Sequence, residues 1–264
     1  MKVKGPNVAG IFYPSDPETL RITVTNFLKT SPLFPLKPMG FIAPHASYVY
    51  SGRVAGVVYK QMQNLDTSKD WRIILIAPSH YVLFEGISFG SYQAFKTPLG
   101  LVEVDRERIE KFIQMEKSVR VSLSDTPYFK EHSLEVQLPF LQVLLNKFYI
   151  IPVLYGDASP KEIKYLLSFF EGEDTLFVVS SDLSHYYPDT VAKVKDNFCH
   201  AGVEGLDVKI LSKCEACGIV GITGAILYAK EKGLKGKLLD YGTSAQSGGE
   251  RHKVVGYGGY VFTS

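Results

Sequence analysis

Two apolar segments of the chain end in the same way, with Ala-Pro and a histidine one or two residues later. The first reads FIAPHASYVYSG from residue 41, and the second reads LIAPSHYV from residue 75. They place His45 and His80 just beyond two expected strands. Proline donates no backbone hydrogen bond, so Pro44 and Pro78 stop strand pairing and free the next side chain to turn inward. The sequence therefore predicts two histidines at equivalent strand ends.

A third apolar run, FVVSSDLSHYY from residue 177, delivers Asp182 and then His185. In an open α/β sheet, ligands bind beyond the carboxyl ends of the strands. We expect all three strands to present their polar residues at one sheet edge. Two imidazoles and an anionic ligand, with positions left for water, form a reactive metal site. A single histidine after a strand is more often a hydrogen-bonded structural residue, and that alternative stays open for each.

The pattern of apolar runs predicts an α/β fold. WRIILIA, YIIPVL and TLFVVSS lack polar alternation, as strands buried on both faces do. Their alternation with amphipathic stretches favours a three-layer α/β/α sandwich with a largely parallel or mixed central sheet. The expected strands are Gly40–Ala43, Arg72–Ala77, Gly86–Phe89, Tyr149–Leu154, Leu176–Ser180, Lys237–Tyr241 and Val254–Phe262, the last at or near a sheet edge.

Helices are expected between these strands. Ser51 and Ser159 have the character of N-caps, and Pro160 suits a first helical position. The expected helices are Pro17–Leu28, Ser51–Gln63, Asp105–Met115, His132–Asn146, Pro160–Phe170, Asp189–Cys199 and Val220–Lys232. No linker or low-complexity tract interrupts the pattern, so residues 1–264 are expected to form a single domain.

Composition excludes several classes of function. Lys and Arg total 29 against 27 Asp and Glu, and no dense basic run appears, so nucleic acid is not an expected partner. No apolar stretch is long enough to span a membrane, and the N-terminus lacks the apolar core of a signal peptide. We expect a cytosolic protein. The absence of a nucleotide fingerprint and of a Gly-x-Ser-x-Gly elbow argues against nucleotide binding and serine hydrolysis.

The three cysteines are too few, and odd in number, for an expected disulfide framework. Cys214 and Cys217 form a lone CxxC, which is weak evidence for zinc. Cys217 precedes Gly218 at a turn into an apolar helix, where the helix dipole favours a thiolate. The alternative for Cys217 is a buried small hydrophobe, and Cys199 is expected in the core.

The remaining histidines are expected to be of minor importance. His132 lies beside Glu131 and Glu135, and such charged pairs on a helix face are usually solvated. His200 and His252 stand in polar segments that we expect to be exposed.

At this point the chain resembles the Memo family, also described in prokaryotes as AmmeMemoRadiSam system protein B. The resemblance runs from VAGIFYPSDPETL at residue 8 to the C-terminus. It includes IAPHASYVYSG, APSHY, KTPLG, EHSLEVQLPFLQ, IIPVLYGD, VVSSDLSHY and the ACG around Cys217. The family usually has His-Ala-Gly-Tyr where this chain has His45-Ala46-Ser47-Tyr48.

The resemblance implies a fold similar to the class III extradiol dioxygenases, which hold non-haem Fe(II) with two histidines and a glutamate. Carried onto this chain, the two histidines are His45 and His80, and the third ligand is Cys217. Asp182 and His185 match the remaining family site residues, as supporting residues or acid–base catalysts. A thiolate favours Fe(II), Cu or Zn and makes ring cleavage less expected.

Three functions follow as hypotheses. The leading one is a cytosolic oxidoreductase that uses iron or copper, in which a base takes a proton from a metal-bound hydroxyl substrate. The second is a non-catalytic adaptor that binds a peptide or modified side chain, with AMMECR-type and radical SAM proteins as implied partners. The third is a zinc hydrolase that uses metal-bound hydroxide.

Overall fold

Five mutually parallel strands, in the order β6-β8-β3-β9-β2, form the centre of one mixed sheet of 12 strands. The computed structural model describes all 264 residues. The antiparallel strand β12 follows β2 and also pairs with β10 and β11, so it lies near the sheet edge as predicted. The strands are β1 (Val3–Lys4), β2 (Pro38–Ala43), β3 (Trp71–Pro78), β4 (Ile87–Ser88), β5 (Ala94–Thr97), β6 (Gly100–Val104), β7 (Val121–Ser122), β8 (Phe148–Tyr155), β9 (Thr175–Ser180), β10 (His185–Tyr187), β11 (Lys235–Thr243) and β12 (Val254–Thr263).

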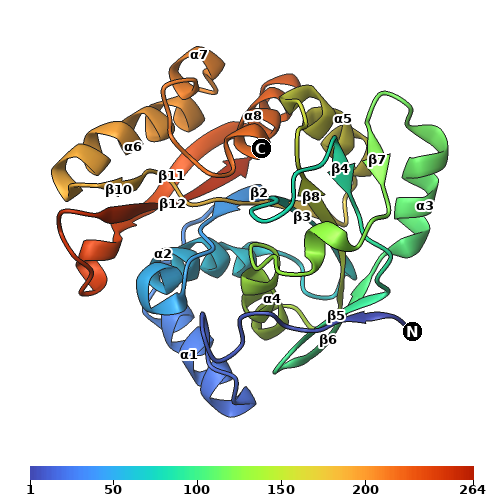
Figure 1. The fold of residues 1–264 in the computed structure, drawn as a ribbon, viewed down its shortest axis with the longest axis horizontal. Coiled ribbons are helices and arrows are strands. Elements are labelled where there is room, and N and C mark those ends of the chain that lie inside the picture. Colours follow the sequence, from blue (N-terminus) through green and yellow to red (C-terminus); the bar gives the residue numbers. More distant parts are fainter.

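Helices cover both faces of this sheet, which confirms the three-layer α/β/α architecture (Figure 1). Helices α1, α2 and α4 pack together on one side, whereas α5 and α8 pack together on the other, with α6 over β11 and β12. The α-helices are α1 (Pro17–Lys29), α2 (Tyr48–Lys60), α3 (Arg106–Met115), α4 (Leu138–Leu144), α5 (Pro160–Phe170), α6 (Asp189–Glu204), α7 (Val208–Leu211) and α8 (Ile219–Lys232). No helix combines the length and the apolar character that crossing a membrane would require.

The strands that carry the expected site are in register. Ala43 of β2 pairs with Ser180 of β9, and Ile76 of β3 pairs with Val179 of β9. Every residue of β9 is buried, because helices cover both faces of the sheet here. The prediction that these three strands end at a common edge is confirmed.

Local sequence signals explain where two helices begin. Helix α5 starts as predicted, because the Ser159 hydroxyl accepts the Glu162 N–H and the Glu162 carboxylate accepts the Ser159 N–H. Helix α2 starts earlier than predicted, with Ser47 rather than Ser51 as N-cap. Ser51 lies inside the helix and donates its hydroxyl proton to the Ala46 carbonyl. Ser47 has a φ of −52°, so the backbone at this position does not require glycine.

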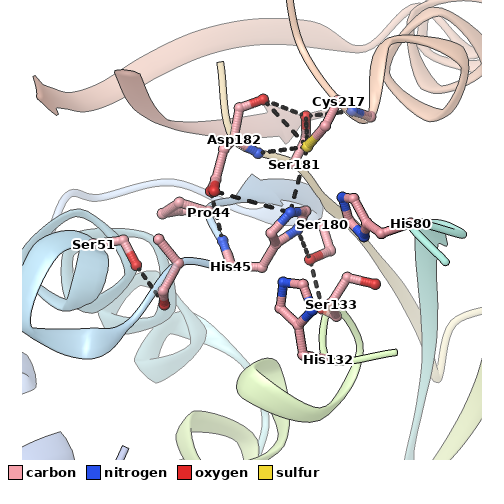
Figure 2. A network of polar contacts seen from close by, with 12 residues as sticks. Pro44, His45, Ser51, His80, His132, Ser133, Ser180, Ser181, Asp182 and Cys217 are labelled. Atoms are coloured by element: carbon pink, nitrogen blue, oxygen red, sulfur yellow. Dashed lines mark hydrogen bonds and ion pairs between the residues drawn. The ribbon is translucent and has the colours of Figure 1, made fainter. Parts of the chain in front are cut away.

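The helix predicted for His132–Asn146 is wrong in its first half. A short 3-10 turn, Glu135–Gln137, leads into α4, which has Pro139 in its first turn. Proline at that position marks a helix start, and the residues before it therefore form a loop. His132 lies in this loop, over the edge where the three parallel strands end (Figure 2).

Cys199 and Cys214 form a disulfide, which corrects the expectation that the chain has none. Cys199 lies on α6, and Cys214 follows α7, 15 residues further along. Their Cα atoms are 4.7 Å apart because the turn after α6 folds α7 back against that helix. Cys199 is also buried, as predicted, so it belongs to the core and to the disulfide together. Cys217 alone remains a free thiol.

Replacing both Cys199 and Cys214 by alanine should lower the free energy of unfolding by about 3 kcal/mol. A closed loop of 15 residues restricts the unfolded chain by about that amount. Denaturant unfolding of the oxidised parent and the double variant measures the difference. The parent treated with dithiothreitol is the matched control and should behave like the variant. Equal midpoints for the oxidised parent and the variant would contradict the prediction.

Candidate metal site

Four of the five site residues expected from the sequence meet at the carboxyl edge of the sheet (Figure 2). His45 follows β2 and His80 follows β3, on either side of β9, which leads to Asp182. Cys217 comes from the turn before α8. The His45 and His80 ring centroids are 5.1 Å apart, and the Cys217 Sγ lies 3.4 Å from the His45 Nε2.

Ser180, the last residue of β9, fixes the tautomer of His45. Its hydroxyl donates to the Ser133 carbonyl at 2.7 Å and accepts a proton of the Gln137 side-chain amide at 2.9 Å. The remaining contact, 2.8 Å to the His45 Nδ1, must therefore be donated by the imidazole. Nδ1 carries the proton, and Nε2 faces Cys217.

Glu131 fixes the tautomer of His80, as Ser180 does for His45. The buried carboxylate accepts the His80 Nδ1–H at 2.9 Å and the His80 backbone N–H at 2.7 Å. It also accepts the backbone N–H groups of His132 and Ser133 at 3.0 Å. Burial raises the pKa of Glu131, but the bonds from His80 and the backbone outweigh this and lower it to about 2. The prediction of a solvated Glu131 is wrong, and a carboxylate behind a ligand histidine is a common feature of metal sites.

Asp182 connects the other two candidate ligands. Its carboxylate Oδ1 accepts the His45 backbone N–H at 2.8 Å, and its own N–H donates to the Cys217 Sγ at 3.2 Å. The Cys217 N–H in turn donates to the Asp182 carbonyl at 3.2 Å. The second carboxylate oxygen, Oδ2, has no hydrogen-bond donor and lies 3.9 Å from the His45 Nε2. Asp182 thus supports the thiolate and keeps one oxygen free.

His132 is a member of the site that sequence reasoning missed. Its ring centroid lies 5.2 Å from that of His80 and 5.5 Å from that of His45, while Phe12 packs on it at 4.9 Å. One nitrogen from each of the three imidazoles lies within 4.8 Å of the others, so the three could hold a metal ion. The Pro139 helix start was the available signal, since it places His132 in a loop. We call His45, His80, His132 and Cys217 the His–Cys cluster.

His185 stands apart from this cluster in its contacts. Its Nδ1 donates to the Leu183 carbonyl at 2.7 Å, and its ring packs against Tyr186. No hydrogen bond or ring contact joins it to the His–Cys cluster. Its role as an acid–base residue stays a prediction.

The cationic imidazoles and the anionic groups of the cluster shift one another's pKa values toward the charged forms. Burial raises the pKa of the Cys217 thiol, but His45 and His80 outweigh this and lower it to about 6. Burial lowers the pKa of His45, yet Cys217 and Asp182 raise it to about 9. Burial likewise lowers that of His80, whereas Cys217 and Glu131 raise it to about 10. Near neutral pH the metal-free cluster is a thiolate between two imidazolium rings.

The donor set fits a metal ion. Metal–nitrogen and metal–sulfur bonds of about 2.1 and 2.3 Å at a tetrahedral angle place N and S about 3.6 Å apart. The observed 3.4 Å between the His45 Nε2 and the Cys217 Sγ matches such an edge. Both Nδ1 atoms are occupied by buried acceptors, so both Nε2 atoms are available as ligands.

The fold and the cluster together define an α/β protein with a candidate metal site at the carboxyl edge of its sheet. A family model described as "Memo-like protein" matches residues 4–261. A MEMO1 family protein of Aquifex aeolicus is 35% identical over 274 residues, covering 99% of this chain and 100% of that protein. One from Archaeoglobus fulgidus is 33% identical over 274 residues, covering 98% and 99%. The chain belongs to the Memo family.

A solved structure shares the fold. The crystal structure of uncharacterized protein JW3007 from Escherichia coli K12 superposes with a TM-score of 0.56 at 10% identity, covering 85% of this chain and 100% of that one. At such low identity the likeness supports the architecture alone.

Metal binding at pH 7.5 should release about two protons per chain. His45 and His80 have pKa values above this pH and must lose a proton to bind, whereas Cys217 is already a thiolate. Metal affinity should therefore fall as the pH falls. Titration calorimetry in buffers of different ionisation enthalpy counts the protons. A release near zero would show that the two imidazoles are not the ligands.

Proposed function

We propose that the protein binds one redox-active divalent metal, Fe(II) or Cu, through His45, His80 and Cys217, and acts as an oxidoreductase on a small molecule or peptide. One observation carries this proposal. His45 and His80, each with its Nδ1 proton held by a buried acceptor, have one nitrogen each within 4.8 Å of the other, and the free Cys217 Sγ lies 3.4 Å from the His45 Nε2.

The donor types favour these metals. A thiolate is a soft ligand that suits Cu and Fe, and imidazole suits Cu, Fe and Zn. When bound, such a metal would supply Lewis acidity and one-electron chemistry. Three ligands from the protein leave coordination positions for a substrate.

The surrounding residues hold the ligands in place. Ser180 and Glu131 fix the orientation of the two rings, and the Asp182 N–H stabilises the thiolate. The Asp182 Oδ2, 3.9 Å from the His45 Nε2, would accept a proton from a substrate hydroxyl. His185 would then pass protons between this region and solvent, since its side chain is partly exposed.

Location and partners are further proposals, and they rest on the sequence. We propose a cytosolic protein, and the Memo resemblance suggests AMMECR-type and radical SAM proteins as partners. The Cys199–Cys214 disulfide weighs against a cytosolic location unless the organism is a hyperthermophile, because disulfides are otherwise rare in the cytosol.

Elemental analysis of protein purified anaerobically without added metal identifies the metal that the protein binds. Stoichiometric zinc would favour a hydrolase instead, and metal-free protein with tight peptide binding would favour an adaptor.

His80→Ala and Cys217→Ser should each weaken Fe(II) or Cu binding strongly, because each variant removes one of the few candidate ligands. Cys214→Ser is the matched control for Cys217→Ser. It breaks the disulfide but removes no ligand, so it should keep about one metal per folded chain. Anaerobic reconstitution followed by metal analysis gives the result. Parent-like binding in both ligand variants would reject the assigned site, and a loss in Cys214→Ser equal to that in Cys217→Ser would assign a ligand role to Cys214.

His185→Ala should retain the metal and lose activity. General acid–base groups typically contribute about 10²–10⁴-fold in rate, and His185 makes no contact with the ligands. Oxygen uptake per folded molecule, with a substrate once identified, measures the loss. Unchanged turnover with a lower melting temperature would leave His185 a purely structural role. Loss of the metal would make it a ligand.

A further inference from the structure

We propose that His132 is a fourth ligand of the metal centre, and the one that an incoming ligand displaces. The inference rests on the proposed function, because it assumes a metal held by His45, His80 and Cys217. It adds a residue from a different element, the loop that precedes α4, which sequence reasoning placed on a solvated helix face.

The position of the ring is the first observation. The ring of His132 stacks on that of His80 with an angle of 25° between their planes, and meets that of His45 nearly at a right angle. In Figure 2 the ring is directed toward His45 from the side opposite Cys217. Since one nitrogen from each imidazole lies within 4.8 Å of the others, small side-chain movements can bring all three to one ion.

The second observation is that the imidazole of His132 makes no hydrogen bond. Its Nδ1 is sealed from solvent and has no partner. The Glu131 Oε1 lies 3.6 Å from this nitrogen, and that oxygen already accepts bonds from His80, Ser133 and the His132 backbone. A buried polar group without a partner is costly, so the structure favours a ligand role in which the ring nitrogen that faces the cluster binds a cation.

The same absence of support distinguishes His132 from the other ligands. His45 and His80 are each anchored through Nδ1 by a buried acceptor, and Cys217 receives the Asp182 N–H. Partners of this kind orient metal ligands, and their loss typically weakens metal affinity 10–100-fold. His132 is held only by packing against Phe12 and the other rings. It is therefore the ligand that leaves most easily, and its departure would open a position for the substrate.

Cobalt(II) titration of the parent and of His132→Ala tests the proposal, with the exposed His252→Ala as the histidine control. The parent and the control should bind one Co(II) with a thiolate-to-cobalt charge-transfer band. His132→Ala should keep that band, because Cys217 remains, but bind about 10–100-fold more weakly, with an altered visible d–d spectrum. Added imidazole should restore the parent's d–d spectrum in His132→Ala by filling the vacant position.

X-ray absorption of the Co(II)-loaded parent provides a measurement that needs no variant. It should show one sulfur and three imidazole ligands. Two imidazoles, or parent-like affinity and spectrum in His132→Ala, would overturn the role of His132 and leave the proposed function intact. A parent that binds no Co(II), or binds it without the thiolate band, would reject both.

Discussion

The parallel register of β2, β9 and β3 is the constraint on which the rest of the site depends. Neighbouring strands lie about 4.8 Å apart, so residues beyond the ends of β2 and β3 start roughly two spacings from one another. Pairing with β9 ends at Ala43 of β2 and at Ile76 of β3, and the two histidines beyond these strands lean inward until their ring centroids are 5.1 Å apart. A slip of one residue would turn these side chains toward the opposite face. The apolar residues of β9 are buried on both faces of the sheet, and their packing fixes the register of the three strands away from the site.

Two buried acceptors orient the pair of histidines as candidate metal ligands. Ser180 and Glu131 each occupy an Nδ1 proton, and each is itself saturated by other bonds, so neither ring is free to turn. In the metal-free cluster, the proton on the His45 Nε2 is shared with the Cys217 thiolate across 3.4 Å. Under the proposed function, a metal ion would be held by the same two side chains after that proton is lost. Charge stays balanced in both states, which explains how a buried thiolate and two imidazolium rings can persist before the metal binds.

The sequence allowed the sheet, its common edge and most of the helices to be predicted, because apolar runs and proline act locally. The family resemblance supplied Cys217. The predictions that were wrong concern features that depend on tertiary contacts. Glu131 and His132 were taken as surface residues from their charge, although Pro139 limits α4 to a later start and leaves both in a buried loop, where Phe12 packs on His132. The Cys199–Cys214 pairing depends on how α7 folds back on α6, which no spacing of three cysteines can indicate.

The hydrogen-bond donors around residue 217 explain why a cysteine suits this third candidate ligand position. A buried carboxylate needs several hydrogen bonds, as Glu131 shows with four donors on its two oxygens. At residue 217 the backbone offers one N–H, that of Asp182, and the neighbouring Ser181 hydroxyl donates to the Asp182 carbonyl. A thiolate is less strongly hydrated and loses less on burial, so one N–H and two cationic rings suffice for it. A glutamate at residue 217 would lack enough hydrogen-bond donors to be buried as a carboxylate without a metal, whereas the thiolate is stable there without one.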